Sequence, residues 1–232
     1  MTVLGIETAT VVCAAAVAAD GNIVAEQALE QHAVHAEKLL TLVDRVLRTS
    51  RVTAAQLDAV AVSIGPGSFT GLRIGLSVAK GLVYATGRPL VAVPTLEALA
   101  CRIGGWPGYP RGVPLLAVLD ARRNEVYCQL FRTGGDRPFP VWEAKDCTFQ
   151  ELDGMLPAGR LLLTGDARRK VAEFLRTVPG RADDIAMLPD ASARCAAGPV
   201  ALLGEGLLRS GVVEDPAVLE PRYIKEFFLQ SR

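Results

Sequence analysis

Two groups of polar residues in this sequence have the residue types needed for phosphate chemistry. The first is Glu7, which stands near the end of an apolar run, within Gly5 to Thr10. An acidic residue at a strand end can position a metal-bound nucleotide, and the hydroxyls of Thr8 and Thr10 could bind its phosphates. The alternative is a strand end whose threonine side chains form local hydrogen bonds. The residue pattern alone favours the local alternative.

The second group is a charged turn that comprises Asp120, Arg122, Arg123 and Glu125 and follows an apolar run in the second half of the chain. If the chain folds into two lobes, this turn could face Glu7 across the space between them, where pockets are frequent. The alternative is a hairpin tip in solvent, which is common. Both interpretations stay open at this point.

The histidines and cysteines give little sign of a metal site or of a nucleophile. His32 and His35 are the only histidines, and a spacing of three could place both on one helix face as metal ligands. No third ligand is evident, so we favour polar side chains that face solvent at a helix entry. The five cysteines are scattered and form no Cys-x-x-Cys pair, which indicates reduced thiols in a cytosolic protein.

A glycine-rich stretch, Ser63 to Gly87, organises the first half of the chain. It follows an apolar run of strand length, Ala59 to Ile64, and continues into a segment of helical length that ends at Gly87 and Pro89. Ser68 or Thr70 can cap this helix. The stretch lacks the Gly-Lys-Ser/Thr ending of a P-loop and the spacing of a dinucleotide fingerprint, so phosphate binding here is only weakly indicated.

The helix predicted over residues 71–86 carries more apolar surface than contact with one sheet requires. Its polar residues form one narrow stripe: Arg73, Ser77, Lys80 and Tyr84. Most other positions are apolar or small, and a glycine inside a helix costs about 1 kcal/mol relative to alanine. Either the helix is buried wholly by its own chain, or one of its sides meets a partner protein.

The elements that would position these residues alternate along the chain. Three strands open it, at 2–8, 11–19 and 23–29, and we expect an antiparallel meander. The rest of the first half is predicted as a helix over about 31–47, the strand at 59–64, the glycine-rich helix, a strand at 90–93 and a helix capped by Thr95. Glycine and proline then crowd residues 104–114, which indicates a linker or lobe boundary.

The second half is predicted to begin with a hairpin of two strands, at 115–119 and 125–132. A Thr148–Glu151 capping box then precedes a short helix. The remaining predicted elements are a strand at 161–164, a helix capped by Asp166, a short strand at 185–188 and a long helix from Asp190 to about Ser210 with a break at Pro199.

The composition is that of a soluble globular protein. The chain has 232 residues, of which 50% are hydrophobic and 22% charged, with a formal net charge of +0. This length suits one large domain or two lobes. Zero net charge argues against a broad electrostatic grip on nucleic acid but leaves room for a local patch. No apolar stretch is long enough for a membrane helix and Met1 leads into a strand, so we expect a cytoplasmic protein without a signal peptide.

The chain resembles the TsaB (YeaZ) family of bacterial tRNA threonylcarbamoyladenosine biosynthesis proteins. Above all, the resemblance is carried by Ser63 to Leu82. Further motifs support it: Gly5 to Thr8, His35 to Leu40, Pro94 to Leu99, Asp120 to Arg122 with Glu125 to Tyr127, and Pro221 to Lys225 near the end. The resemblance is strongest through about residue 130.

The resemblance implies an α/β fold of two actin-like ATPase lobes without a competent nucleotide site. Residues 1–105 would form the lobe that carries the partner-binding helices, and residues 106–232 a smaller lobe whose tail returns toward the first. It also implies a non-catalytic subunit that binds and activates the catalytic paralogue TsaD, which places threonylcarbamoyl on adenosine 37 of tRNA. The ATPase TsaE would join the complex, tRNA would be its substrate, and this chain alone would form a homodimer.

The resemblance places the TsaD contact on two helices, at about 33–48 and 71–86. The residues expected there are apolar or small: Leu39, Leu42, Val43, Val46, Gly71, Leu72, Gly75, Leu76 and Ala79. The motif loop that leads into the second helix comprises Gly65, Pro66, Gly67, Ser68, Phe69, Thr70 and Arg73. Glu7, Thr8 and Asp120 would mark a vestigial nucleotide site.

Departures from TsaD imply that this chain has no metal site and no catalytic residue of its own. TsaD carries a His-x-x-x-His pair, whereas His32 and His35 are spaced by three, and Asp120 to Arg123 stand where TsaD has glycines. ATP and metal are therefore expected in the partner subunits. Two alternatives stay open: an actin-fold ATPase or kinase that acts alone through Glu7 and Asp120, and a homodimeric binding module that uses the same helices.

Overall fold

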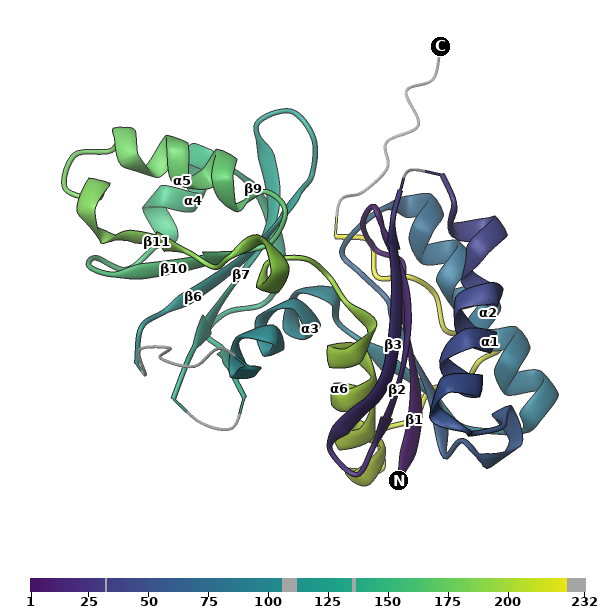
Figure 1. Ribbon diagram of the computed structural model, residues 1–232. Helices are drawn as coiled ribbons and strands as arrows, with labels where there is room; N and C mark the ends of the chain where they lie inside the picture. Colours follow the sequence, from purple (N-terminus) through teal and green to yellow (C-terminus); the bar gives the residue numbers. More distant parts are fainter. Residues whose placement is uncertain (32, 106–111, 135–136, 225–232) are drawn as a thin grey trace, which may run out of the picture.

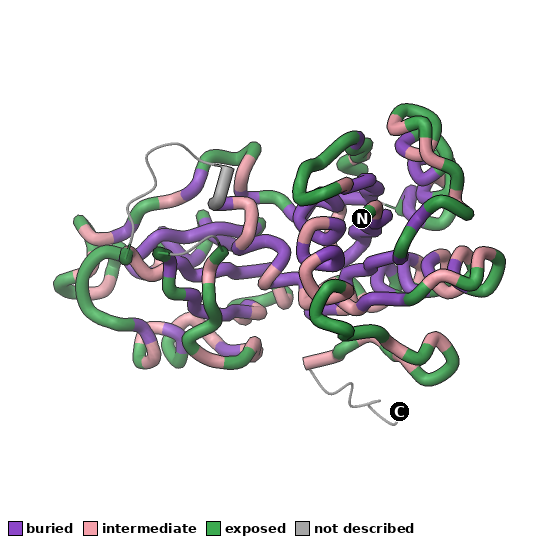
Figure 2. Tube along the Cα trace, turned by 90° about the horizontal axis from the view of Figure 1, so that it is seen from below, coloured by how far each residue is buried: buried purple, intermediate pink, exposed green. Residues whose placement is uncertain are grey.

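The chain folds into two lobes, each built around one β-sheet, as the computed structural model shows (Figure 1). The structure describes residues 1–31, 33–105, 112–134 and 137–224. Buried residues follow the strands of both sheets, whereas many residues in the outer loops are exposed (Figure 2). Among the described helices, none is long and apolar enough to cross a membrane.

The first sheet has the strand order β3-β2-β1-β4-β5. The first three strands form the predicted antiparallel meander, and β4 and β5 continue the sheet in parallel with β1. The strand bounds are β1 (Thr2–Glu7), β2 (Val12–Ala19), β3 (Asn22–Glu30), β4 (Ala59–Ser63) and β5 (Leu90–Val93). Every residue of β4 is buried, as expected for a strand covered on both faces.

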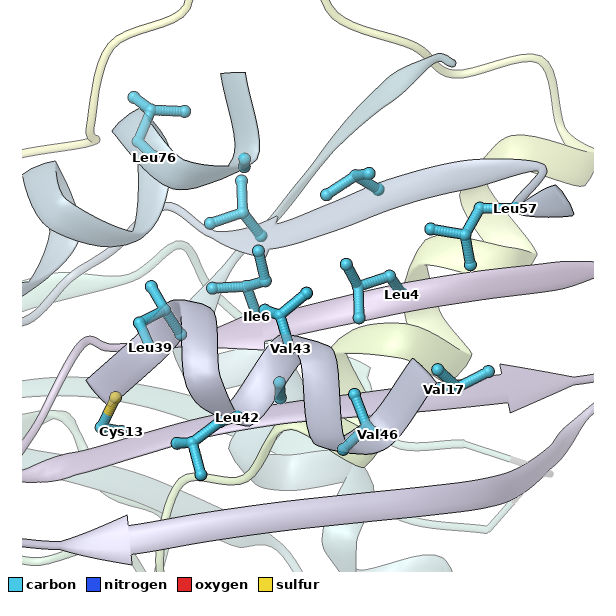
Figure 3. Close-up of a cluster of buried hydrophobic side chains, with 14 of the residues drawn as sticks. Leu4, Ile6, Cys13, Val17, Leu39, Leu42, Val43, Val46, Leu57 and Leu76 are labelled. Atoms are coloured by element: carbon cyan, nitrogen blue, oxygen red, sulfur yellow. The ribbon is translucent and has the colours of Figure 1, made fainter. Parts of the chain in front are cut away.

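Helices cover both faces of the first sheet. The helices α1 (His35–Ser50) and α2 (Phe69–Thr86) lie side by side on one face, and α6 (Ala197–Arg209) lies on the other (Figure 1). Buried side chains of α1 lie against the strands, where Leu39 and Val43 pack close to Ile6 (Figure 3). The short helix α3 (Thr95–Cys101) contacts both α6 and the second sheet, so it joins the two lobes.

The second sheet has the order β11-β10-β6-β7-β8, with β9 paired to β7. Its strands are β6 (Leu115–Asp120), β7 (Glu125–Arg132), β8 (Phe139–Pro140), β9 (Lys145–Thr148), β10 (Leu161–Thr164) and β11 (Ile185–Met187). The helices α4 (Phe149–Met155) and α5 (Arg168–Thr177) pack beside this sheet. Like β1, the strand β6 pairs antiparallel with the next strand of the chain and parallel with a later one.

Two predicted helix caps are wrong, although the helices themselves form. The helix α3 begins at Thr95 with Pro94 as its N-cap, and the Thr95 hydroxyl accepts a hydrogen bond from the Gly65 N–H at 3.1 Å instead. The helix α5 begins at Arg168 after Ala167, so Asp166 does not cap it. The capping box predicted at Thr148 is confirmed, and a second capping box forms between Thr53 and Gln56.

The long helix predicted from Asp190 is also wrong. Only a short 3-10 turn forms over Asp190–Ser192, and α6 begins at Ala197. Pro199 lies in the first turn of α6, where a missing N–H breaks no helical hydrogen bond. Because α6 packs against the first sheet, the expected second lobe of residues 106–232 is too long at its C-terminal end. The expected boundary near residue 106 lies outside the described residues.

Candidate functional site

The glycine-rich motif packs directly against the turn that joins β1 to β2. A Cβ added to Gly67 would lie 2.3 Å from the carbonyl oxygen of Ala9, and one added to Gly71 would lie 2.1 Å from that of Thr8. At Gly75 it would lie 2.2 Å from the Thr8 hydroxyl oxygen. The Ser68 N–H also donates to the Ala9 carbonyl at 2.7 Å. The glycines are therefore needed for the close approach of α2 to this turn.

The start of α2 is fixed by local capping. The Ser68 side chain accepts a hydrogen bond from the Gly71 N–H at 3.2 Å, which confirms one of the two predicted caps. The helix ends at Gly87, whose φ of +68° is the left-handed conformation of a glycine C-cap. These two caps therefore define where α2 begins and ends.

The C-terminal tail reaches back to the same motif. The Arg222 N–H donates to the Ile64 carbonyl at 2.7 Å, and a Cβ on Gly65 would lie 2.4 Å from the Arg222 carbonyl oxygen. The rings of Phe69 and Tyr223 stack with centroids 4.9 Å apart. Two motifs that are about 150 residues apart in the sequence therefore form one contact.

Arg73 completes this contact. Its guanidinium carbon lies 3.8 Å from the centroid of the Phe69 ring, and its Nε donates to the Tyr223 hydroxyl at 2.9 Å. A cation above an aromatic face is attracted by the negative face of the ring. The sequence singled out Phe69 and Arg73 in one motif and Tyr223 in another, but it did not predict their contact, because Arg73 and Tyr223 are 150 residues apart.

Glu7 is fully buried at the end of β1. Its Oε1 accepts a hydrogen bond from the Ala9 N–H at 2.6 Å, and its Oε2 has no partner among the described residues. Burial raises the pKa of this carboxyl to about 7, and the hydrogen bond from the Ala9 N–H only partly opposes the shift. Glu7 therefore belongs to the interior of the first lobe rather than to an open cleft.

Asp120 lies in a very different setting. It is exposed at the end of β6, where its carboxylate pairs with Lys170 at 2.6 Å and accepts the Arg122 N–H at 2.9 Å. No hydrogen bond or ion pair joins it to Glu7 or Thr8, all three of which are described. The residues predicted for a vestigial nucleotide site thus divide into a buried pair in one lobe and an exposed residue in the other.

His35 does not face solvent as expected. It is buried, and its Nε2 lies 3.2 Å from the Val12 carbonyl oxygen, so it contributes to the packing of α1 on β2. His32 lies outside the described residues. Within the described ranges, no group of three or more histidine, cysteine or acidic side chains is placed to hold a metal ion.

The nine residues expected at a partner contact all lie in the interior of the first lobe. Leu39, Leu42, Val43 and Val46 are at most 3% exposed, and the five residues expected on α2 are also buried. The predicted positions therefore need correction, because the sheet and the β1–β2 turn already occupy the space beside them. Sequence periodicity could not distinguish contact with the lobe itself from contact with a partner.

The outer faces of these two helices carry a different set of apolar side chains. Leu40 on α1 is 58% exposed and Tyr84 on α2 is 94% exposed. Ile74, Val78 and Leu82 form a half-buried row at four-residue steps along α2. Of the polar stripe predicted on α2, Arg73, Ser77 and Tyr84 are exposed and Lys80 is half-buried. We call Leu40, Ile74, Val78, Leu82 and Tyr84 the outer helix face.

Comparison with known proteins relates this arrangement to a family. The family model described as "TsaD: tRNA N6-adenosine threonylcarbamoyltransferase" matches residues 14–178. Two proteins named tRNA threonylcarbamoyladenosine biosynthesis protein TsaB are similar: that of Escherichia coli is 39% identical over 55% of this chain and 53% of its own, and that of Bacillus subtilis is 30% identical over 57% and 56%. In these matches, the chain spans about half the length of the curated relatives.

A solved structure agrees over nearly the whole chain. YeaZ from Pseudomonas aeruginosa has a TM-score of 0.80 and 25% identity, with 96% of this chain and 99% of that chain covered. The two lobes have the actin-like ATPase fold that the sequence predicted. Because the family model covers well over half of the chain, the chain belongs to the family that this model describes, and within it to the TsaB (YeaZ) proteins.

Proposed function

We propose that this chain is a non-catalytic subunit of the complex that places threonylcarbamoyl on adenosine 37 of tRNA. In this proposal it binds a TsaD-type paralogue and holds that protein in its active conformation. The names of its relatives support the pathway, and the match to a TsaD family model supports a related protein as partner. Because the substrate would be tRNA, we place the complex in the cytoplasm.

The outer helix face is the observation that carries the proposal. Its most exposed members, Leu40 and Tyr84, lie on adjacent helices, and the half-buried row on α2, which also packs against the core of the first lobe, adds further apolar surface. Large apolar side chains gain free energy when a partner removes them from water, at about 25 cal/mol per Å². A paralogue with equivalent helices could pack against this face and form a bundle of four helices. A second copy of this chain would use the same face in the homodimer.

The non-catalytic role is supported by the turn that follows β1. In the first lobe, α2 closes on the β1–β2 turn, and the Glu7 carboxyl is enclosed below it. A group that positions a metal-bound nucleotide would need access to that ligand. We therefore assign ATP and metal to the partner subunits, with a TsaE-type ATPase as a further member of the complex.

Light scattering after size exclusion tests the proposal on this chain mixed with its cognate TsaD-type protein. The wild type should elute as a complex with the mass of equal numbers of both subunits. Leu40→Glu places a charge on the outer helix face without touching the core, and we expect it to weaken association at least tenfold. Tyr84→Ala should weaken it less.

A matched control separates the interface from a general surface effect. Val218 is 73% exposed on the tail, and Val218→Glu should leave the complex intact. Separate peaks for the wild-type proteins, with both proteins folded, would contradict the proposed partnership. A complex that tolerates Leu40→Glu would place the contact on another face.

A further inference from the structure

A groove in the second lobe has no part in the function proposed above. It has a volume of about 470 Å³ and lies where the β6–β7 hairpin tip meets α4 and α5. The hairpin tip contributes Arg123 and Asn124, and α5 contributes Lys170 and Glu173. We call this the hairpin-tip groove. It is formed by elements of the second lobe, away from the outer helix face.

One wall of the groove is aromatic. Phe149 at the start of α4 and Phe174 on α5 are both half-buried, and their ring centroids are 5.5 Å apart. Their partial exposure leaves aromatic surface in the groove, although both also pack against the core of the second lobe. An aromatic surface of this kind can stack with a planar base, whichever base it is.

The rim of the groove is basic. Arg123 is exposed, and its guanidinium has no hydrogen bond or ion pair among the described residues. The neighbouring Arg122 is exposed in the same way. Lys170 pairs with Asp120 at 2.6 Å, and Glu173 is the acidic residue of the lining. Because Lys170 is already paired with Asp120, Arg123 is the lining cation left to attract an anionic ligand, and Glu173 could accept hydrogen bonds from donors of that ligand.

The hairpin tip keeps arginines where other residues would be more stable. Arg122 and Arg123 have φ values of +71° and +57°, in the left-handed region. Asparagine and glycine are the residues that favour two such positions in a hairpin turn. The left-handed backbone at two arginines costs conformational free energy. The turn leaves both arginine side chains exposed to solvent beside the groove.

From these contacts, we propose that the hairpin-tip groove binds a single-stranded segment of RNA. A base would stack on the Phe149–Phe174 pair, phosphates would lie beside Arg123 and Lys170, and Asn124 and Glu173 would bond to base edges. This assignment rests on the proposed function, in which tRNA is the substrate of the complex. It assigns to the second lobe a direct contact with that substrate.

Fluorescence anisotropy with the full chain and a labelled decaadenylate RNA tests the assignment. The double variant Arg123→Asn with Lys170→Gln removes both charges, and asparagine tolerates the left-handed backbone at 123. We expect at least tenfold weaker binding, and a plot of log affinity against log salt whose slope is less steep by about 1.4. Phe174→Leu should weaken binding at least fivefold through lost stacking.

Arg176→Gln is the matched control, because Arg176 is exposed on the same helix and does not line the groove. It should bind RNA within twofold of the wild type. Thermal melting checks that each variant is folded. Light scattering with the TsaD-type partner is run in parallel, so a failed partnership is distinguished from failed RNA binding.

Three results would overturn the assignment. The first is no binding of the RNA by the wild type up to about 500 μM, which is weaker than typical non-specific binding. The second is equal loss of binding in the control and in the double variant. The third is equal affinity for an RNA duplex without single strands or for an oligoglutamate peptide, since either would reveal a general anion-binding surface.

Discussion

The two lobes share a strand arrangement, yet a helix packs against the equivalent turn in a different way in each lobe. In each lobe a central strand, β1 or β6, turns into its antiparallel neighbour, and a helix that follows a parallel strand reaches that turn. In the first lobe, the glycines of α2 bring its backbone against Thr8 and Ala9. In the second, side chains make the contact: Asp166 accepts the Asp120 N–H at 2.9 Å, and Lys170 pairs with Asp120.

This difference explains what the long glycine-rich motif does. A glycine-rich loop before a helix often indicates phosphate binding, because the helix N-terminus favours anions. Here the space that such glycines leave is filled by the chain itself, from the β1–β2 turn and from the tail. The motif is a packing feature, and polar side chains remain exposed only at the turn of the second lobe.

Gly71→Ala should have the largest effect, because its Cβ would lie 2.1 Å from the backbone carbonyl oxygen of Thr8. Neither backbone can move easily, so we expect a loss of about 3 kcal/mol in the free energy of unfolding. Urea denaturation measures it. The control is Gly81→Ala on the same helix, where a Cβ meets nothing within 4 Å and where stability should rise by about 0.5–1 kcal/mol. Equal effects at both positions would refute the packing explanation.

Glu7→Gln should change how stability depends on pH. The pKa of Glu7 is raised from 4.5 to about 7 in the folded state, so the unfolded chain releases the proton first as pH rises. The wild type should therefore lose roughly 3 kcal/mol relative to the variant between about pH 4.5 and pH 7, and little more above that. Urea denaturation at several pH values measures the difference.

Gly81→Ala serves again as the control in that titration, because it keeps the buried carboxyl. Its stability should follow the pH profile of the wild type. Parallel profiles for the wild type and Glu7→Gln would show that the Glu7 carboxyl is not held in a buried, uncharged form. The contrast between the buried Glu7 in the first lobe and the exposed Asp120 in the second would then be refuted.

Asp166→Ala tests how the second lobe closes its turn. It removes the acceptor for the Asp120 N–H, and we expect a loss of about 1 kcal/mol, typical of one hydrogen bond. Asp183→Ala, at an exposed acidic residue in the same lobe, should change stability by less than about 0.5 kcal/mol. If Asp166→Ala were as neutral as this control, the side-chain contact would contribute nothing.

Tyr223→Leu should have the smallest effect on global stability, about 0.5 kcal/mol, through lost contact with Phe69 and Arg73. Its local effect should be larger, because the tail loses an anchor on the first lobe. Limited proteolysis should cut the tail several times faster than in the wild type. Val218→Ala on the same tail should leave the cleavage rate unchanged.

The sequence was sufficient to predict the order of most elements and the family, but it did not predict the strands β8 and β9 or the start of α6. The alternating apolar runs predicted the antiparallel meander and the parallel strands, and Ser68 was one of two caps proposed for α2. These features depend on residues close together in the chain. The family followed from a motif of about twenty residues.

Long-range contacts set the limit of this prediction. Asp166 has the residue type of a helix cap, yet it bonds to a residue 46 positions away. The residues assigned to a partner contact, such as Leu39 and Gly75, are apolar or small because the sheet and Thr8 pack against them. An amphipathic pattern indicates that a side chain is buried, but it does not indicate which surface buries it.

The position of α6 and of the tail has a consequence for synthesis. Both elements pack on the first lobe, although they come after the whole second lobe in the chain. On the ribosome, α1 and α2 can cover one face of the first sheet early, while the other face waits for residues after Ala196. The lobe that is begun first is therefore completed last, and any nascent chain that stops short of α6 leaves apolar strands exposed.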